Sequence, residues 1–250
     1  MSVRTAVNQR LDLALVEQGL APSRERAQAL IAAGLVLVGT ERARSAAQRV
    51  GEGAELSVSG RDHPWVGRGG VKLAAALDGF GIAVTGRVAL DAGASTGGFT
   101  EVLLDRGAER VYAVDVGYGQ LDPRLAGDPR VVVMDRTNLR LLESLPGPAP
   151  SLVTLDLAFI SLRLVLERVA ALAAPGAEVV ALFKPQFEVG RAEVGKGGIV
   201  RSPEAIDAAL SRFRESCRAI GYAVKAEAPS EVTGAEGNRE IFVQLRPEKL

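Results

Sequence analysis

The segment from Leu90 to Thr100 constrains the fold more than any other part of this 250-residue chain. It reads Leu-Asp-Ala-Gly-Ala-Ser-Thr-Gly-Gly-Phe-Thr, and the apolar residues Val88 and Ala89 precede it. A strand that delivers an acidic residue, a glycine-rich turn and then a helix form the first unit of a Rossmann-like sheet. The segment therefore predicts a nucleotide-type cofactor site where this strand ends.

The spacing of the glycines narrows the choice of cofactor. A pyrophosphate-binding turn has the pattern G-x-G-x-x-G, in which the second glycine lets the backbone approach the diphosphate. In the frame that starts at Gly93 and ends at Gly97 and Gly98, Ser95 stands at that second position. A cofactor without a pyrophosphate tolerates the serine. S-adenosylmethionine is such a cofactor, whereas a nicotinamide dinucleotide is disfavoured.

Acidic residues suit both ends of this cofactor. Asp91 could accept a hydrogen bond from the ammonium group of the methionine moiety, and Asp115, after the apolar run 111–114, could bind the ribose hydroxyls. Asp135 opens the polar run 135–138, which is well placed to contact the adenine amino group. The alternative for each carboxylate taken alone is a helix cap or a turn residue.

Composition excludes several classes of protein. Apolar residues make up 47% of the chain, which is enough for a sizeable core, and the formal net charge is zero. The one cysteine, Cys217, cannot form an internal disulfide, and its helical context indicates a buried thiol. We find no histidine–cysteine cluster for a metal and no uncharged apolar stretch long enough to span a membrane. The N-terminus lacks the apolar core of a signal peptide, so a cytoplasmic location is expected.

The chain is expected to hold two domains. Residues 1–61 contain two helical patterns (10–20 and 23–33) and β-like pieces at 35–38 and 55–58, which indicate a small α+β module. Residues 62–67 are predicted to be a linker, in which Trp65 is expected to pack against a domain rather than stack on a base. Residues 68–250 alternate between helix and strand, which predicts an α/β domain with a mostly parallel sheet covered on both faces. Strands are expected at 88–90, 111–116, 131–134, 152–156, 178–183, 222–227 and 240–245, and helices at 71–79, 99–106, 162–172 and 203–220.

Lys184 stands in an unusual place for a lysine, directly after the predicted strand 178–183 and before Pro185. A lysine beside another cation in a desolvating pocket can lose its proton near neutral pH. It could then take the proton of a ribose hydroxyl as that oxygen attacks a methyl group. A salt bridge with Asp156 is the structural alternative, and the two interpretations are compatible. Methyl transfer needs little beyond in-line positioning and this base, and it requires no metal.

Longer motifs resemble known families over nearly the whole chain. Residues 10–12, 23–28 and 33–38 resemble the S4 RNA-binding fold. Residues 65–73 (Trp-Val-Gly-Arg-Gly-Gly-Val-Lys-Leu), 91–100, 156–161, 183–188 and 195–200 are similar to the TlyA family of ribosomal RNA methyltransferases, often labelled hemolysin A. One departure is Gly67, where family members usually carry serine. A second is the run 38–40, which lacks the asparagine usual in the S4 β-turn.

The resemblance implies a Rossmann-like class I methyltransferase domain of the FtsJ type, with S-adenosylmethionine as methyl donor. It implies 2′-hydroxyls of cytidines in ribosomal RNA as targets, ribosomal subunits as partners, and a catalytic tetrad of Lys72, Asp156, Lys184 and Glu240. The expected cofactor-binding residues are Asp91, Gly93, Ser95, Gly97, Gly98, Phe99, Asp115 and Asp135. The expected RNA-binding residues are Arg10, Arg24, Arg26 and Arg68.

Two other functions are compatible with the sequence. A non-catalytic RNA-binding factor for ribosome assembly could retain the cofactor fold, although the converging polar residues argue against it. The older family label suggests a membrane-damaging protein. That function is disfavoured because the chain has neither a spanning segment nor a strongly basic amphipathic helix.

Overall fold

The computed structural model describes residues 9–21, 23–32, 34–51, 53–58, 63–234 and 237–248. The chain separates into two compact units, residues 1–64 and residues 65–250. This division falls inside the segment 62–67 that the sequence predicts to be a linker.

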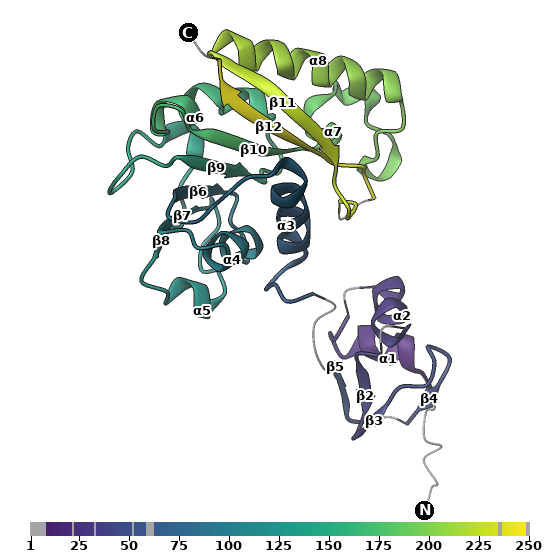
Figure 1. Ribbon diagram of the computed structural model, residues 1–250. Helices are drawn as coiled ribbons and strands as arrows, with labels where there is room; N and C mark the ends of the chain where they lie inside the picture. The colour runs from purple at the N-terminus through teal and green to yellow at the C-terminus, as the bar shows by residue number, and fades with distance from the viewer. Residues whose placement is uncertain are drawn as a thin grey trace, which may run out of the picture. The chain divides into compact units, whose positions relative to one another are not determined.

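The N-terminal unit packs two helices against short strands (Figure 1). Ser23 caps the second helix, because its Oγ accepts a hydrogen bond from the backbone N of Arg26 at 3.2 Å, as the sequence predicts. Strands β1, β3 and β4 have two residues each and carry no alternating pattern, so they could not be predicted. The elements are β1 (Gln9–Arg10), α1 (Leu11–Glu17), α2 (Arg24–Ala32), β2 (Val36–Val38), β3 (Glu41–Arg42), β4 (Arg49–Val50) and β5 (Leu56–Val58).

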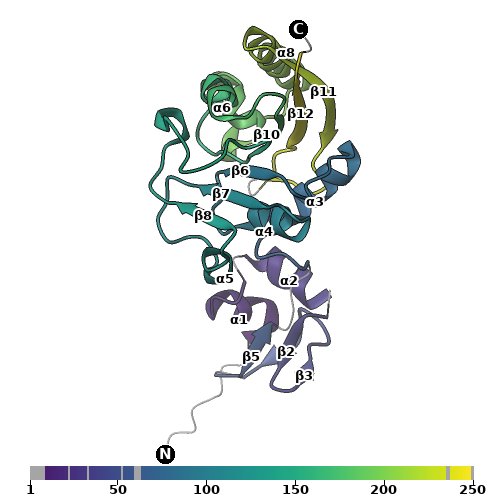
Figure 2. The same cartoon turned by 60° about the vertical axis from the view of Figure 1, so that its left-hand side comes forward.

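The larger unit is built on a seven-stranded sheet in the order β11-β12-β10-β9-β6-β7-β8. Figure 2 shows β8 near one edge and β11 near the other. β12 alone runs in the opposite direction to the other six strands, so the predicted mostly parallel seven-stranded sheet is confirmed. The strands are β6 (Val88–Ala92), β7 (Arg110–Val114), β8 (Val131–Met134), β9 (Leu152–Leu155), β10 (Glu178–Phe183), β11 (Tyr222–Pro229) and β12 (Ile241–Pro247).

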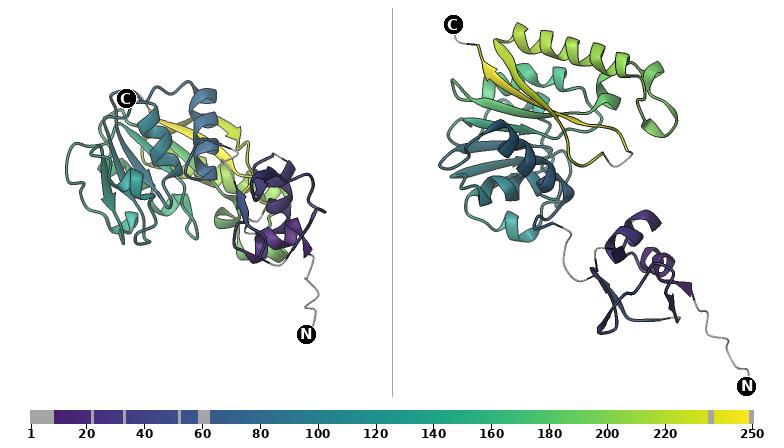
Figure 3. Two further views of the ribbon diagram at one scale, coloured as in Figure 1. Left: turned by 90° about the horizontal axis from the view of Figure 1, so that it is seen from below. Right: turned by 45° about the vertical axis from the view of Figure 1, so that its right-hand side comes forward.

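Helices cover both faces of this sheet (Figures 1 and 3). Helices α3 (Arg68–Phe80) and α4 (Gly98–Asp105) pack on one face, and α6 (Leu166–Leu172) and α8 (Pro203–Ala219) pack on the other. Ser202 caps α8 through a hydrogen bond from the backbone N of Ala205 at 3.2 Å, as predicted. Cys217 lies buried in α8, and burial raises the pKa of its thiol to about 12, which leaves it unreactive.

Helix α3 begins at Arg68 rather than at residue 71 as the sequence predicts. Two consecutive glycines at 69–70 are typical of a segment outside a helix, so the sequence predicts a later start. In the structure both lie in α3, and a Cβ added at Gly70 would lie 2.2 Å from Cγ of Trp65. Gly70 is therefore needed for close packing of the Trp65 ring and not for a turn. Trp65 and Val66 pack against the apolar cluster on the α3 face.

Two further differences concern short helices. The predicted helix 162–172 is divided at Val165 into a 3₁₀ turn, η2 (Leu162–Leu164), and α6. The remaining short helices were not predicted because each is too short to show a period. They are α5 (Pro123–Ala126), η1 (Leu139–Leu141), α7 (Pro185–Glu188), η3 (Arg191–Glu193) and η4 (Lys196–Gly198).

Candidate active site

The turn between β6 and α4 needs glycine at two positions. Gly93 has φ +86°, and a Cβ there would lie 2.4 Å from the backbone O of Asp156. Gly97 has φ +99°, and a Cβ there would lie 2.4 Å from Cδ1 of Leu125. Both residues combine left-handed backbone with close approach, so any side chain would deform the turn.

Ser95 takes a left-handed conformation in the same turn, with φ +47°. Its backbone N donates to Oδ2 of Asp115 at 2.8 Å, and the backbone N of Gly117 donates to Oδ1 at 2.7 Å. Asp115 follows β7 directly, so one carboxylate fixes the ends of two neighbouring strands relative to each other. Non-glycine residues in this conformation are strained and cluster at functional sites. Among the described residues the others are Arg136 and Phe159.

Asp91 lies inside the domain, with no exposed surface. Oδ2 accepts from Oγ1 of Thr100 at 2.6 Å, and Oδ1 accepts from Oγ1 of Thr154 at 3.2 Å. Burial raises the pKa of the Asp91 carboxyl to about 7, although the two threonine hydrogen bonds act in the opposite direction. The structure therefore places Asp91 behind the glycine-rich turn rather than on a cavity wall. Sequence reasoning missed both threonines, although Thr100 belongs to the motif.

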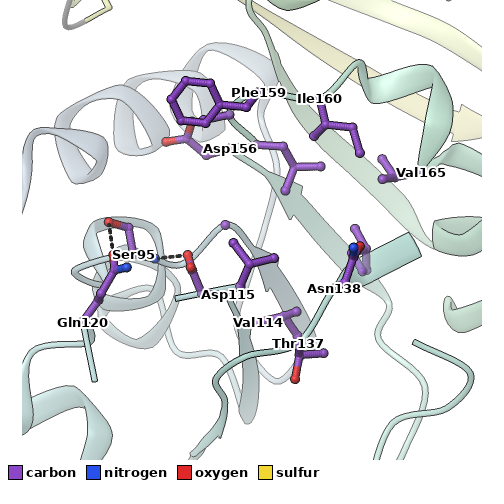
Figure 4. Close-up of a pocket in the computed structure, with 15 residues that line it drawn as sticks. Ser95, Val114, Asp115, Gln120, Thr137, Asn138, Asp156, Phe159, Ile160 and Val165 are labelled. Atoms are coloured by element: carbon purple, nitrogen blue, oxygen red, sulfur yellow. Dashed lines mark hydrogen bonds between the residues drawn. The ribbon is translucent and has the colours of Figure 1, made fainter. Parts of the chain in front are cut away.

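Two adjoining cavities lie at the carboxyl ends of the strands. The larger has a volume of about 480 Å³ and the smaller about 130 Å³, and both are lined by Gly93, Ser95 and Asp156. Figure 4 shows the larger one between Ser95 and Asp115 on one side and Asp156, Phe159 and Ile160 on the other. The apolar walls of the larger cavity are Val114, Val116, Leu139, Leu157, Ala158, Ile160 and Val165.

Several predicted cofactor residues line these cavities and others support them. Gly98 and Phe99 line the smaller cavity, as does Arg68, which the sequence predicts to be an RNA-binding residue. Thr137 and Asn138 line the larger one, whereas Asp135 lies outside the lining and its Oδ2 accepts from the backbone N of Gly119 at 2.8 Å. Its neighbours in the same polar run therefore line the cavity and Asp135 does not, and Gln120 is a further lining residue that the sequence did not indicate.

The four tetrad residues form two ion pairs. Lys184 Nζ lies 2.6 Å from Oδ1 of Asp156, and Lys72 Nζ donates to Oε2 of Glu240 at 2.5 Å. All four side chains are largely buried, with exposed fractions from 3% for Glu240 to 22% for Asp156. A Cβ added at Gly69 would lie 4.0 Å from Oδ2 of Asp156, so the first turn of α3, about one turn before Lys72, passes beside the other pair.

Phe159 is the most exposed large apolar residue of the part of the chain that the structure describes, at 90%. It has φ +64°, lines the larger cavity and contacts the Phe187 ring at a centroid distance of 5.4 Å. An exposed aromatic ring on a strained backbone is unusual, because a ring in water gains no packing energy that could offset the strain. Phe159 belongs to the motif 156–161, but the sequence alone predicts no role for it.

In the N-terminal unit, Asp12 holds two of the expected RNA-binding arginines, together with Gln28. It is fully buried and accepts from Arg10 through Nε and Nη2, each at 2.9 Å. Arg24 Nε and Gln28 Nε2 also donate to it, each at 2.9 Å. The Arg10 guanidinium holds the pKa of Asp12 well below its usual range. The side chains of Arg10 and Arg24 are still 33% and 51% exposed, so their outer N–H groups face solvent.

Comparison with known proteins assigns both units. The model of the FtsJ-like methyltransferase family matches residues 65–247, and that of the S4 domain matches residues 9–56. A Mycobacterium tuberculosis protein named 16S/23S rRNA (cytidine-2′-O)-methyltransferase TlyA is 46% identical over 95% of this chain and 89% of its own length. The chain belongs to the TlyA family of FtsJ-like methyltransferases.

Other TlyA-family relatives carry a different name. Hemolysin A of Brachyspira hyodysenteriae is 36% identical over 94% of this chain and 99% of its own length. A solved structure of a Streptococcus thermophilus protein, also named as a hemolysin, has a TM-score of 0.78 and 39% identity, and covers 97% of this chain and 89% of its own. Within the described residues of the present TlyA-family chain, no helix is long and apolar enough to cross a membrane.

Proposed function

We propose that this protein transfers a methyl group from S-adenosylmethionine to the 2′-hydroxyl of a cytidine in ribosomal RNA, with Lys184 as the base. The observation that carries the proposal is that Asp156 lines both cavities and holds Lys184 at 2.6 Å. A basic amine is thus paired with a carboxylate that both cavities share. The name of the Mycobacterium tuberculosis relative supports the choice of substrate.

The cavities fit the parts of the donor. The larger one has mostly apolar walls, with Asp115 and Asn138 as polar groups, which suits a flat adenine and its ribose hydroxyls. The smaller one is lined by the polar groups of Arg68 and Thr96, which suit an amino acid moiety. When bound, S-adenosylmethionine supplies a methyl group made electrophilic by its sulfonium. Asp91 would not contact the donor. Its hydrogen bonds with Thr100 and Thr154 would hold the glycine-rich turn in place.

Each residue of the tetrad has a separate role in the proposed methyl transfer. The Lys184 amine would take the proton of the 2′-hydroxyl while that oxygen forms its bond to the methyl carbon and the carbon–sulfur bond breaks. Asp156 orients the amine, and Lys72 supplies a second positive charge near the developing alkoxide. Glu240 holds Lys72 in place. Most of the acceleration comes from in-line positioning, so this chemistry needs no further group.

The target nucleotide has a candidate stacking partner in Phe159. Chemistry on a single nucleotide of structured RNA requires that nucleotide to leave its stack, and exposed aromatic rings receive the extruded base. Phe159 is exposed at the rim of the larger cavity. The S4 domain, through Arg10, Arg24 and Arg26, would hold the surrounding RNA by its phosphates. Such a substrate also places the enzyme with ribosomes in the cytoplasm.

The proposal is tested with methyl-labelled donor and separate 30S and 50S subunits. Wild type should label ribose, identified after nuclease digestion, and Lys184→Ala should lower the rate by about 10²-fold or more. Lys225→Ala is the control, because Lys225 is an exposed lysine on β11. Equal labelling by Lys184→Ala would remove Lys184 as the base. Donor binding without label on either subunit would favour the assembly-factor function instead.

A further inference from the structure

Two segments at the carboxyl ends of β9 and β10 lie against each other along their length. Residues 156–162 follow β9, and residues 184–188 follow β10, its parallel neighbour. Asp156 pairs with Lys184 at 2.6 Å at the start of both segments. The rings of Phe159 and Phe187 meet in the middle. The far ends are joined by Glu188.

Glu188 uses both of its carboxylate oxygens on the opposite segment. Oε2 accepts from Oγ of Ser161 at 2.6 Å, and Oε1 accepts from the backbone N of Leu162 at 2.6 Å. The side chain is only 2% exposed, with Arg163 Nε at 3.9 Å from Oε2. Removal of this carboxylate would leave the buried N–H of Leu162 and the half-buried hydroxyl of Ser161 without their acceptor.

The conformation of Phe159 makes these anchors necessary. Its backbone has φ +64° and its ring is 90% exposed, so the packing of its own side chain contributes little to hold it. A strained residue persists only when the surrounding structure fixes it. The anchors on either side are Asp156, which also donates its backbone N to the O of Ala92 at 3.0 Å, and the Ser161–Leu162 pair on Glu188.

We propose that Glu188 is a positioning residue that fixes the 156–162 segment, and with it the Phe159 ring, in the orientation that receives the target nucleotide. This inference rests on the proposed function of the site. Glu188 touches neither cavity and lies four residues beyond Lys184, at the end of α7. It acts through Phe159, so its loss should matter only while Phe159 is present.

A double-mutant cycle measures that dependence. In single-turnover methyl transfer at saturating donor and subunits, Glu188→Ala and Phe159→Ala should each lower the rate by roughly tenfold, and the double variant should be within about twofold of the slower single variant. Glu188→Gln should keep most of the rate, because its amide can accept from Leu162 N and donate to Ser161 Oγ. If the two single-variant reductions in rate multiply in the double variant, the two residues act independently and the proposal is overturned.

A second readout does not depend on activity. In a Phe159→Trp reporter, corrected for the signal of Trp65, the fluorescence anisotropy should fall when Glu188→Ala is added. An unchanged anisotropy would overturn the proposal even if the enzyme were inactive on ribosomal RNA. If wild type fails to methylate either subunit while the anisotropy responds, the proposed function fails and the positioning role of Glu188 stands.

The matched control is Glu178→Ala. Glu178 opens the same strand, β10, at its opposite end and accepts from Arg87 at 2.7 Å and Arg246 at 2.6 Å. Its loss should lower the melting temperature without changing the reporter anisotropy. If Glu188→Ala yields little folded protein, Ser161→Ala replaces it in the test. This change removes one of the two hydrogen bonds to Glu188, and with it the acceptor of the Arg163 backbone N at 3.3 Å, while the bond from Leu162 N to Glu188 remains. It should lower the anisotropy and the rate in the same direction, and no effect on either would contradict the proposal.

Discussion

Lys72 Nζ and Glu240 Oε2 lie 2.5 Å apart although 168 residues separate them in the sequence. The pair joins the first turns of α3 to the residue before β12, and both side chains are nearly buried. It is thus a structural cross-link as well as part of the proposed catalytic tetrad. These two roles can be separated experimentally.

We expect Glu240→Ala to lower the free energy of unfolding by about 3–5 kcal/mol, because it leaves the Lys72 ammonium buried without its partner. Lys72→Met combined with Glu240→Leu removes both charges and should restore most of that stability. The double variant should still lack methyl transfer. Denaturant unfolding and the subunit-labelling assay measure the two properties, and a double variant with wild-type activity would remove the pair from the chemistry.

Sequence reasoning reached the sheet, the glycine-rich turn and the strand-end position of Lys184, because these depend on local period and on a turn that only glycine permits. It could not derive the Lys72–Glu240 pair from spacing, since nothing local relates two residues so far apart, and only the family resemblance indicated both. It also gave Asp91 and Asp135 direct contacts with the cofactor. In the structure neither carboxylate lines the two cavities, because Asp91 accepts from two threonines inside the domain and Asp135 accepts from the backbone N of Gly119. A sequence does not reveal which polar partner a carboxylate finds.

The buried carboxyl of Asp91 should make stability fall as the pH rises. Its pKa is about 7 in the folded protein against an ordinary value of 3.8, so the folded state binds the proton more tightly than the unfolded chain between these values. Stability from this group is therefore complete below pH 4 and is lost progressively up to about pH 7. The difference in unfolding free energy between wild type and Asp91→Asn should shrink over that range by up to about 4 kcal/mol. A difference that is constant with pH would show that Asp91 stays ionised.

The left-handed turn at Gly97 should be essential for donor binding. Gly97→Ala adds a Cβ 2.4 Å from Leu125 and 2.8 Å from Leu121, so the turn must move. Gly86→Ala is the matched control, because Gly86 has φ +71° and nothing within 4 Å of an added Cβ. Each change should cost about 1–2 kcal/mol of stability from backbone strain. Only Gly97→Ala should weaken donor binding, by roughly tenfold or more in calorimetry, and equal affinities for the two variants would contradict this role.

The N-terminal arginines should contribute to RNA affinity through charge. Arg24 is anchored by Asp12 through Nε at 2.9 Å, which leaves the outer N–H groups of its exposed guanidinium for a phosphate. Arg24→Ala should weaken binding to ribosomal subunits and lower the slope of log affinity against log salt by about 1. Arg218→Ala, at an exposed arginine in the last turn of α8, should change neither quantity. Filter binding over a series of salt concentrations measures both, and an unchanged slope for Arg24→Ala would place the phosphate contact elsewhere.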